Sequence, residues 1–119
     1  MQNRRKRQIN YHIGLFAEFI ATVFLKIKFY SIVKRRYRCN FGEIDIIAAK
    51  GNKIIFVEVK KRDSFITESI STPSSHRIKR SADYFLAKNL QYSNHEVRID
   101  LIQLNKFLLP KHFKDYINW

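Results

Sequence analysis

The N-terminal part of the chain has the hydrophobic spacing of an amphipathic helix. Apolar residues recur at steps of three and four positions: Ile13, Phe16, Ile20, Phe24 and Ile27. This spacing places them on one stripe of a helix, so we predict a helix over residues 9–28. Residues 1–8 are polar and basic, and we expect them to form a flexible arm before it.

Three strands are predicted after this helix. Aromatic and β-branched residues at 29–33 indicate the first strand, with an extension to Arg38 left open. Residues 43–49 and 53–61 form the second and third. Gly51-Asn52, between them, suits the two-residue loop of a tight hairpin.

A second helix and a further strand follow. Residues 62–72 are polar and rich in serine, which predicts a loop. Pro73 suits the first turn of a helix with Thr72 as its N-cap, and apolar spacing continues this helix to about residue 90. Residues 96–104 are predicted as the fourth strand.

The last fifteen residues are interrupted by Pro110, and we expect a short strand followed by a helical turn. The predicted element order is therefore αβββαβ. The hairpin makes its two strands antiparallel, whereas the second helix permits a parallel crossover. The sequence predicts one α/β domain over residues 1–119, with a mixed central sheet flanked by helices.

The charge balance indicates a polyanionic partner. Twenty-three Lys and Arg against ten Asp and Glu give a formal net charge of +13, more than a solvated surface requires. Many basic residues fall into two clusters: Arg4, Arg5, Lys6 and Arg7, then Lys34, Arg35, Arg36 and Arg38. We expect these clusters to contact the phosphates of DNA, with RNA as the alternative.

The basic start followed by the apolar stretch from Ile13 to Leu25 also resembles a signal peptide or membrane anchor. Glu18 lies inside the stretch, where a carboxylate is costly in lipid. The stretch of 13 residues is shorter than the roughly 20 that a spanning helix needs, and no small-residue cleavage site follows. We therefore expect no membrane association. The single cysteine, Cys39, fits a reducing compartment such as the cytoplasm.

The hairpin brings acidic residues together. With Gly51-Asn52 as its loop, Asp45 is predicted to face Glu58, and Glu43 to face Lys60. Residues opposed in this way have Cβ atoms about 4.5–5.5 Å apart, where two partly buried carboxylates repel each other. Mg²⁺ prefers carboxylate and phosphate oxygens, so this arrangement predicts a site for Mg²⁺ or Mn²⁺.

The same charges also have a structural interpretation. Glu58 and Lys60 could pair with each other or with Glu43 at a sheet edge, and a Glu-Val-Lys sequence alone is unspecific. Asp45 on the opposite strand and the basic character of the chain favour the site. Glu18 interrupts an apolar helix, and it either points into a site or lies on a narrow solvated side.

Other polar residues carry weaker signals. Arg98 and Asp100 are expected to form a structural ion pair in the fourth strand. The four histidines are scattered without the spacing of metal ligands.

An ordered set of motifs resembles the YraN-like family. It comprises Gly14, Glu18, Ala21, Arg38, Gly-Glu-Ile-Asp-Ile-Ile at 42–47, Phe-Val-Glu-Val-Lys at 56–60, Arg62 and Arg-Ile-Asp at 98–100. The match covers roughly residues 14–102. That family is similar to archaeal Holliday junction resolvases and belongs to the restriction-endonuclease-like superfamily, whose motif is an Asp followed by Glu-x-Lys.

The resemblance implies Asp45 and Glu58 as metal ligands, Lys60 as the catalytic lysine and Glu18 as a further acidic site residue. Our hypothesis is a Mg²⁺- or Mn²⁺-dependent endonuclease that hydrolyses phosphodiester bonds in DNA. The Val59 carbonyl would be a third ligand. A branched substrate would favour a homodimer.

The sequence departs from the family pattern in three places, one of them a stretch of three residues. Ser74-Ser75-His76 stands where the family usually has Lys and a polar residue, and Arg77 or Lys79 could replace that lysine. Arg36 stands where Asn is common, and Phe29 where Gly is common. The predicted nucleic-acid contacts also include Arg62, Arg77 and Lys79. A nucleic-acid-binding module without cleavage and a ribosome-associated RNA-binding protein remain the alternatives.

Overall fold

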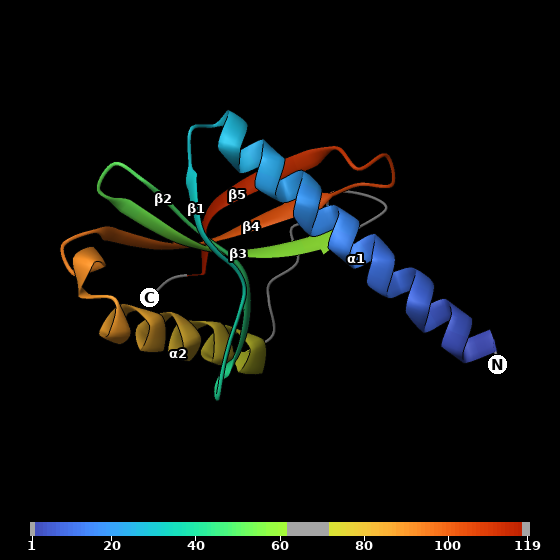
Figure 1. The fold of residues 1–119 in the computed structure, drawn as a ribbon, viewed down its shortest axis with the longest axis horizontal. Coiled ribbons are helices and arrows are strands. Elements are labelled where there is room, and N and C mark those ends of the chain that lie inside the picture. Colours follow the sequence, from blue (N-terminus) through green and yellow to red (C-terminus); the bar gives the residue numbers. More distant parts are fainter. Residues whose placement is uncertain (1, 62–71, 118–119) are drawn as a thin grey trace.

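The computed structural model describes residues 2–61 and 72–117, with side chains for residues 14–61 and 75–117. Its centre is a five-stranded sheet with the strand order β1-β2-β3-β4-β5. The strands are β1 (Ser31–Cys39), β2 (Gly42–Lys50), β3 (Lys53–Lys61), β4 (Glu96–Leu104) and β5 (Pro110–Ile117). Helix α1 (Gln2–Ile27) covers one face and helix α2 (Thr72–Lys88) the other (Figure 1).

The sheet is mixed, as the sequence predicts. Strands β3 and β4 are parallel, and the remaining neighbours are antiparallel. The crossover between β3 and β4 carries α2 and the short 3₁₀ helix η1 (Leu90–Tyr92). This mixed α/β architecture with flanking helices confirms the predicted fold class and is compatible with a restriction-endonuclease-like fold.

Two apolar layers fill the spaces between the sheet and the helices. The layer under α1 contains Ala17, Ala21, Leu25, Ile46, Val57 and Ile102, and the layer under α2 contains Ile44, Ile47, Phe56, Ile78, Ala82 and Phe85. Strand β3 supplies residues to both layers in alternation, because it is buried on both faces. Burial on both faces explains why the sequence of β3 is a continuous apolar run.

The predicted start of α1 is wrong. The helix begins at Gln2, so residues 2–8 continue the helix instead of forming an arm before it. Its first turns project beyond the sheet (Figure 1). Among the described residues, no helix combines the length and hydrophobicity that a membrane crossing requires.

The first strand begins at Ser31, two residues later than predicted, because α1 ends in a Schellman motif. The amide of Tyr30 donates to the carbonyl of Leu25 (3.0 Å), and the amide of Phe29 donates to the carbonyl of Lys26 (2.9 Å). Phe29 has φ 71°, the left-handed conformation that glycine normally supplies. The strand then extends past Arg38 to Cys39.

The C-terminal prediction is half right. The strand is β5, which begins at Pro110 at the edge of the sheet, where a missing amide hydrogen is tolerated. It continues to Ile117, so the helical turn is wrong within the described residues. Helix α2 ends at Lys88, two residues before the predicted end, and η1 follows. The predicted serine-rich loop and the Thr72 side chain lie outside the described residues and side chains.

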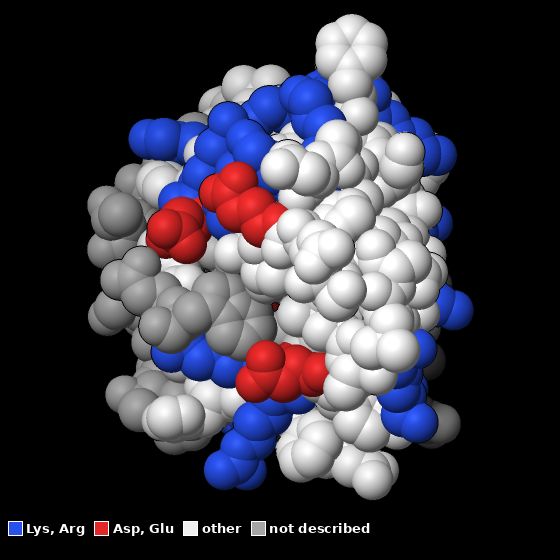
Figure 2. Space-filling model, turned by 90° about the vertical axis from the view of Figure 1, so that its left-hand side faces the viewer, with Lys and Arg blue, Asp and Glu red and all other residues white. Residues whose placement is uncertain are grey.

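One face of the surface shows how the charged side chains are distributed. On the face shown in Figure 2, Lys and Arg side chains lie mostly around the outline, and Asp and Glu form two small groups. Basic side chains thus outnumber acidic ones on this face, as they do in the sequence.

Candidate functional site

The site lies where strand β2 twists at Asp45. Ile44 and Ile46 are two positions apart and would share a face of a regular strand. Instead, Ile44 packs in the layer under α2 and Ile46 in the layer under α1. Next to Asp45 on β1, Arg36 has φ 52° and interrupts the regular pairing between Arg35–Ile46 and Tyr37–Ile44. The twist turns the Asp45 side chain out of the regular alternation.

The hairpin pairing ends just before the acidic residues. The ladder of β2 and β3 runs from Lys50–Lys53 to Ile46–Val57, as predicted up to that point. The predicted pairs Asp45–Glu58 and Glu43–Lys60 are not part of it. Instead, the amide of Val59 donates to Oδ2 of Asp45 at 2.8 Å. The register prediction is wrong here because it assumed a regular hairpin.

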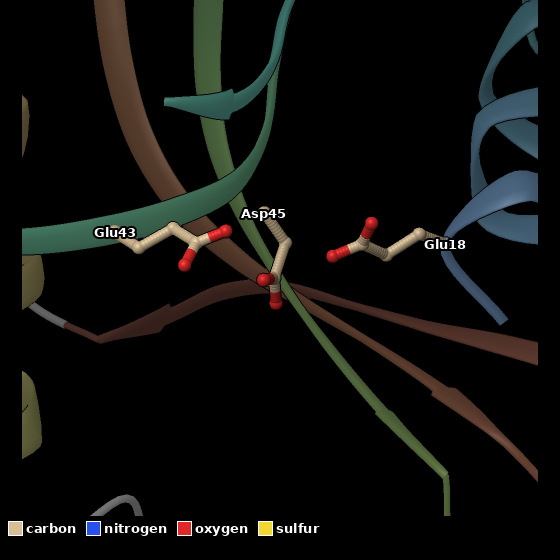
Figure 3. A group of neighbouring side chains, drawn as sticks. All are labelled: Glu18, Glu43 and Asp45. Carbon is tan, nitrogen blue, oxygen red and sulfur yellow. The ribbon is translucent and has the colours of Figure 1, made fainter. Parts of the chain in front are cut away.

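Three carboxylates from two elements converge at this twist. Glu18 extends from α1, and Glu43 and Asp45 extend from β2, with their carboxylates directed toward one another (Figure 3). One oxygen from each lies within 4.8 Å of the others. Hard oxygen donors without nitrogen or sulfur are the donor set that Mg²⁺ and Mn²⁺ prefer. The cluster could hold such an ion.

Glu58 and Lys60 lie beside this cluster. They line the same cleft of about 340 Å³ as Glu18, Glu43 and Asp45. Nζ of Lys60 is 3.1 Å from Oε1 of Glu58, so the ion pair of the structural interpretation is present. It lies within the acidic cleft, and the charges of both residues act on Asp45.

The electrostatics of Asp45 reflect this crowding. The pKa of Asp45 is raised from 3.8 to about 7: burial contributes most, the charges of Glu58 and Glu18 add to it, and the Val59 hydrogen bond and the charge of Lys60 oppose it. The cleft therefore disfavours the ionised form of this carboxyl group. A cation in the cleft would remove the main repulsion and favour the ionised form.

Two of the predicted nucleic-acid contacts pair with the cluster. Nε of Arg36 is 2.9 Å from Oε2 of Glu18, and Nε of Arg38 is 3.4 Å from Oε2 of Glu43. The Arg38 side chain is 76% exposed, so it can also reach a ligand outside the cleft. Each of these carboxylates thus has a guanidinium partner within the protein.

The other predicted basic contacts are more widely spread. Lys34 and Arg35 are exposed on β1. Arg77, on α2, lines a smaller cavity of about 260 Å³ together with Glu43 and Glu58, and Lys79 is half-buried. Arg77 is therefore placed beside the acidic cleft, as the predicted replacement for the family lysine requires. Four side chains of the first basic cluster lie outside the described part of the structure, as does the whole of Arg62. The four are Arg4, Arg5, Lys6 and Arg7.

Arg98 and Asp100 form the predicted ion pair, at 3.0 Å. Nε2 of His112 is 2.8 Å from the fully buried Asp100 carboxylate, which also accepts a hydrogen bond from the Asp115 amide. Burial alone would raise the pKa of Asp100, but the hydrogen bonds from His112, Arg98 and Asp115 outweigh it and lower the pKa. This cluster joins β4 to β5 and has a structural role.

Sequence reasoning missed the place of Glu43 in the acidic cluster. Its spacing of two from Asp45 predicts that both residues share a face of the strand with Glu58 and Lys60, but that prediction left the role of Glu43 open. The assumed regular register assigned Glu43 to Lys60 instead. Glu18, the acid that interrupts the apolar helix, lines the cleft, and its role in a site stays a prediction.

Comparison with known proteins gives consistent matches. A family model described as "Uncharacterised protein family UPF0102" matches residues 17–104, a range that includes Glu18, Asp45, Glu58 and Lys60. A UPF0102 protein of Rhizobium etli (strain CIAT 652) is 38% identical over 104 residues, covering 86% of this chain and 85% of the relative. One of Ehrlichia ruminantium (strain Gardel) is 40% identical over 89 residues, covering 75% and 70%. One of Bartonella tribocorum is 36% identical over 111 residues, covering 92% and 85%.

Proposed function

The chain belongs to the UPF0102 family, the YraN-like family of its sequence resemblance, and from the geometry of its acidic cleft we propose that it is a metal-dependent endonuclease acting on DNA. The observation that carries the proposal is the convergence of Glu18, Glu43 and Asp45 within 4.8 Å. The Glu58–Lys60 pair lines the same cleft. An acidic pocket in a chain of net charge +13 is the arrangement expected where a cation and a phosphate meet.

The residues present fit a hard divalent cation. Asp45, Glu43 and Glu18 would hold it with their converging carboxylates, and Glu58 and the Val59 carbonyl, the ligands that the family resemblance implies beside Asp45, belong to residues that line the same cleft. Mg²⁺ or Mn²⁺ bound there would polarise a phosphoryl oxygen and lower the pKa of a water molecule. In the proposed reaction, the attacking water gives up a proton to solvent and its oxygen adds to phosphorus, the bond from phosphorus to the leaving sugar oxygen breaks, and that oxygen takes up a proton from solvent.

Lys60 is the residue that would act on the transition state. Its Nζ, held 3.1 Å from Oε1 of Glu58, lies in the cleft beside the proposed cation ligands. An ammonium group there neutralises the charge that develops on the phosphoryl oxygens, or orients the attacking water. Glu58 would thus serve both as a ligand and as the residue that positions Lys60.

The basic surface supports DNA as the substrate. Arg38, which lines the cleft and is 76% exposed, is suited to contact the phosphate backbone there, and Lys34 and Arg35 are exposed farther along β1. The sequence carries no motif for reading bases, so we propose recognition of DNA structure, such as a branch or a single strand. Binding should weaken with salt, by about −0.9 in the log–log slope for each neutralised phosphate.

The test uses purified protein with branched, single-stranded and duplex DNA, with Mg²⁺, Mn²⁺ or a chelator. Wild type should cleave only with metal, and Asp45→Asn and Glu58→Gln should reduce the rate by about a hundredfold or more. Asp83→Asn, at an exposed carboxylate on α2, is the matched control and should cleave normally.

Three outcomes would contradict the proposal. Cleavage by Asp45→Asn at the wild-type rate would indicate a contaminating nuclease or another site. Salt-sensitive DNA binding without any cleavage would establish a binding module instead. Tighter binding to structured RNA than to DNA would point to the RNA alternative.

A further inference from the structure

Helix α1 is apolar on two opposite sides. Ala17, Ala21 and Leu25 are buried against the sheet. On the outer side lies a second set, here called the outer stripe, which consists of Phe16, Phe19, Val23 and Ile27, exposed by 52%, 53%, 40% and 70%. Its spacing of three, four and four residues follows the helix period. An apolar stripe on a helix is normally covered by another surface.

The outer stripe is too large to be scattered surface hydrophobicity. Aromatic side chains cover about 150–250 Å² when buried, so the two half-exposed rings alone leave roughly 200 Å² of apolar surface open. With Val23 and Ile27 the stripe reaches about 400 Å², within the range of interaction patches on monomers. Two such stripes would bury about 800 Å², the size of a weak and reversible contact between two copies.

We propose that the outer stripe joins two copies of this chain, with their α1 helices packed side by side and antiparallel. In this orientation Phe16 of one copy meets Ile27 of the second, and Phe19 meets Val23. Each large ring then opposes a smaller aliphatic side chain, in the manner of helix packing by interlocking side chains. The Phe16 and Phe19 rings already stack at 6.5 Å and present one continuous surface.

Charge selects the orientation. Residues 4–7 are all basic, and a parallel pair would place the two runs beside each other. An antiparallel pair that crosses near residue 21 separates them by about 50 Å, at a rise of about 1.5 Å per residue. Glu18 is the sole acidic residue in the sequence of α1, and it faces the cleft. The interface would therefore depend on apolar burial and not on ion pairs.

The sign of the salt effect distinguishes a second copy from an anionic lipid surface. Two copies of net charge +13 repel each other, so added salt should strengthen their association by screening. Binding of the same stripe to anionic lipid would weaken with salt. The inference does not depend on the catalytic proposal, because the outer stripe lies away from the cleft residues on α1.

The test is sedimentation of the full chain over a wide concentration range at low and high salt. Wild type should form dimers that strengthen with salt. Phe19→Glu and Val23→Lys, each alone, should weaken association by about tenfold or more. Mixing these two variants should restore it, because the antiparallel pair places position 19 of one copy beside position 23 of the other. Leu90→Glu, at a 72% exposed side chain on η1, is the control and should behave as wild type.

Circular dichroism and thermal unfolding would show that the variants are folded. A wild type that stays monomeric at every concentration and salt would overturn the proposal. Failure of the mixed variants to associate would overturn the antiparallel arrangement. Co-sedimentation with phosphatidylserine vesicles that disappears at high salt, without self-association, would assign the stripe to a lipid surface instead.

Discussion

The amide of Val59 on β3 donates a hydrogen bond of 2.8 Å to Oδ2 of Asp45 on β2. This bond lies just beyond the last regular pair of the two strands, Ile46–Val57. It fixes the Asp45 carboxylate at the base of the acidic cleft although Glu58 and Glu18 repel it. The same bond holds the candidate ligand in position and keeps it ready for a cation.

The pH dependence of the free energy of unfolding should reveal the raised pKa of Asp45. Its pKa is about 7 in the folded protein against an ordinary value of 3.8. Between these values the folded protein holds a proton that the unfolded chain has lost, so the contribution of Asp45 to stability falls as pH rises from about 4 to 7. Asp45→Asn lacks this loss and should gain about 4 kcal/mol over wild type across the window. Urea unfolding at a series of pH values measures the difference, and Asp83→Asn is the control. Parallel curves for Asp45→Asn and wild type would contradict the pKa shift.

Divalent cations should stabilise the protein, and more strongly at higher pH. Binding must displace the proton from Asp45, so the rise in Tm with Mg²⁺ or Mn²⁺ should be larger at pH 8 than at pH 6. At a concentration of about a hundred times Kd, the expected gain is about 2.7 kcal/mol. Thermal unfolding with metal and with chelator measures it. Equal stabilisation of wild type and of a double variant, Asp45→Asn with Glu58→Gln, would place the cation elsewhere.

Arg36 should compete with a cation for the acidic cluster. Its Nε lies 2.9 Å from the Glu18 carboxylate, and Asn tolerates a φ of 52° better than most residues. Arg36→Asn should therefore preserve the backbone while leaving Glu18 unneutralised. We expect the metal-free protein to lose about 1 kcal/mol of stability and its affinity for Mn²⁺ to rise several-fold. Calorimetric titration measures the affinity, with the exposed neighbour Arg35→Asn as control. An unchanged or lower affinity would show that Arg36 does not oppose the cation.

The sequence predicted the fold well because its apolar spacing was regular. The limits of β3 and β4 agree with the prediction, since a run such as Ile54 to Val57 is buried on both faces by the two helices. The hairpin register was also correct as far as Ile46–Val57. These features depend on the local hydrophobic pattern and on turn geometry, and both are determined by residues close together in the sequence.

The candidate site was harder to predict because it lies where the regular pairing of β2 with β3 ends. The twist at Asp45 depends on the left-handed backbone at Arg36 and on a side-chain bond to the Val59 amide. Neither follows from hydrophobic spacing. The identities of Glu18, Asp45, Glu58 and Lys60 were predicted, but the arrangement that joins Glu43 to Glu18 required the packing of α1 against the sheet.

The end of α1 offers a direct test of backbone strain. Phe29 occupies the position of the Schellman motif that requires a left-handed residue, with φ 71°, and its side chain is 82% exposed. A non-glycine residue there costs about 1–2 kcal/mol in backbone energy. Phe29→Gly should therefore raise the free energy of unfolding by about 1 kcal/mol, after allowance for the greater freedom of glycine in the unfolded chain. Phe29→Ala removes the same ring but keeps the strained conformation, so it should bring no gain. Urea unfolding of the three proteins measures this, and equal stability of the Gly and Ala variants would show that the left-handed backbone at residue 29 carries no measurable strain.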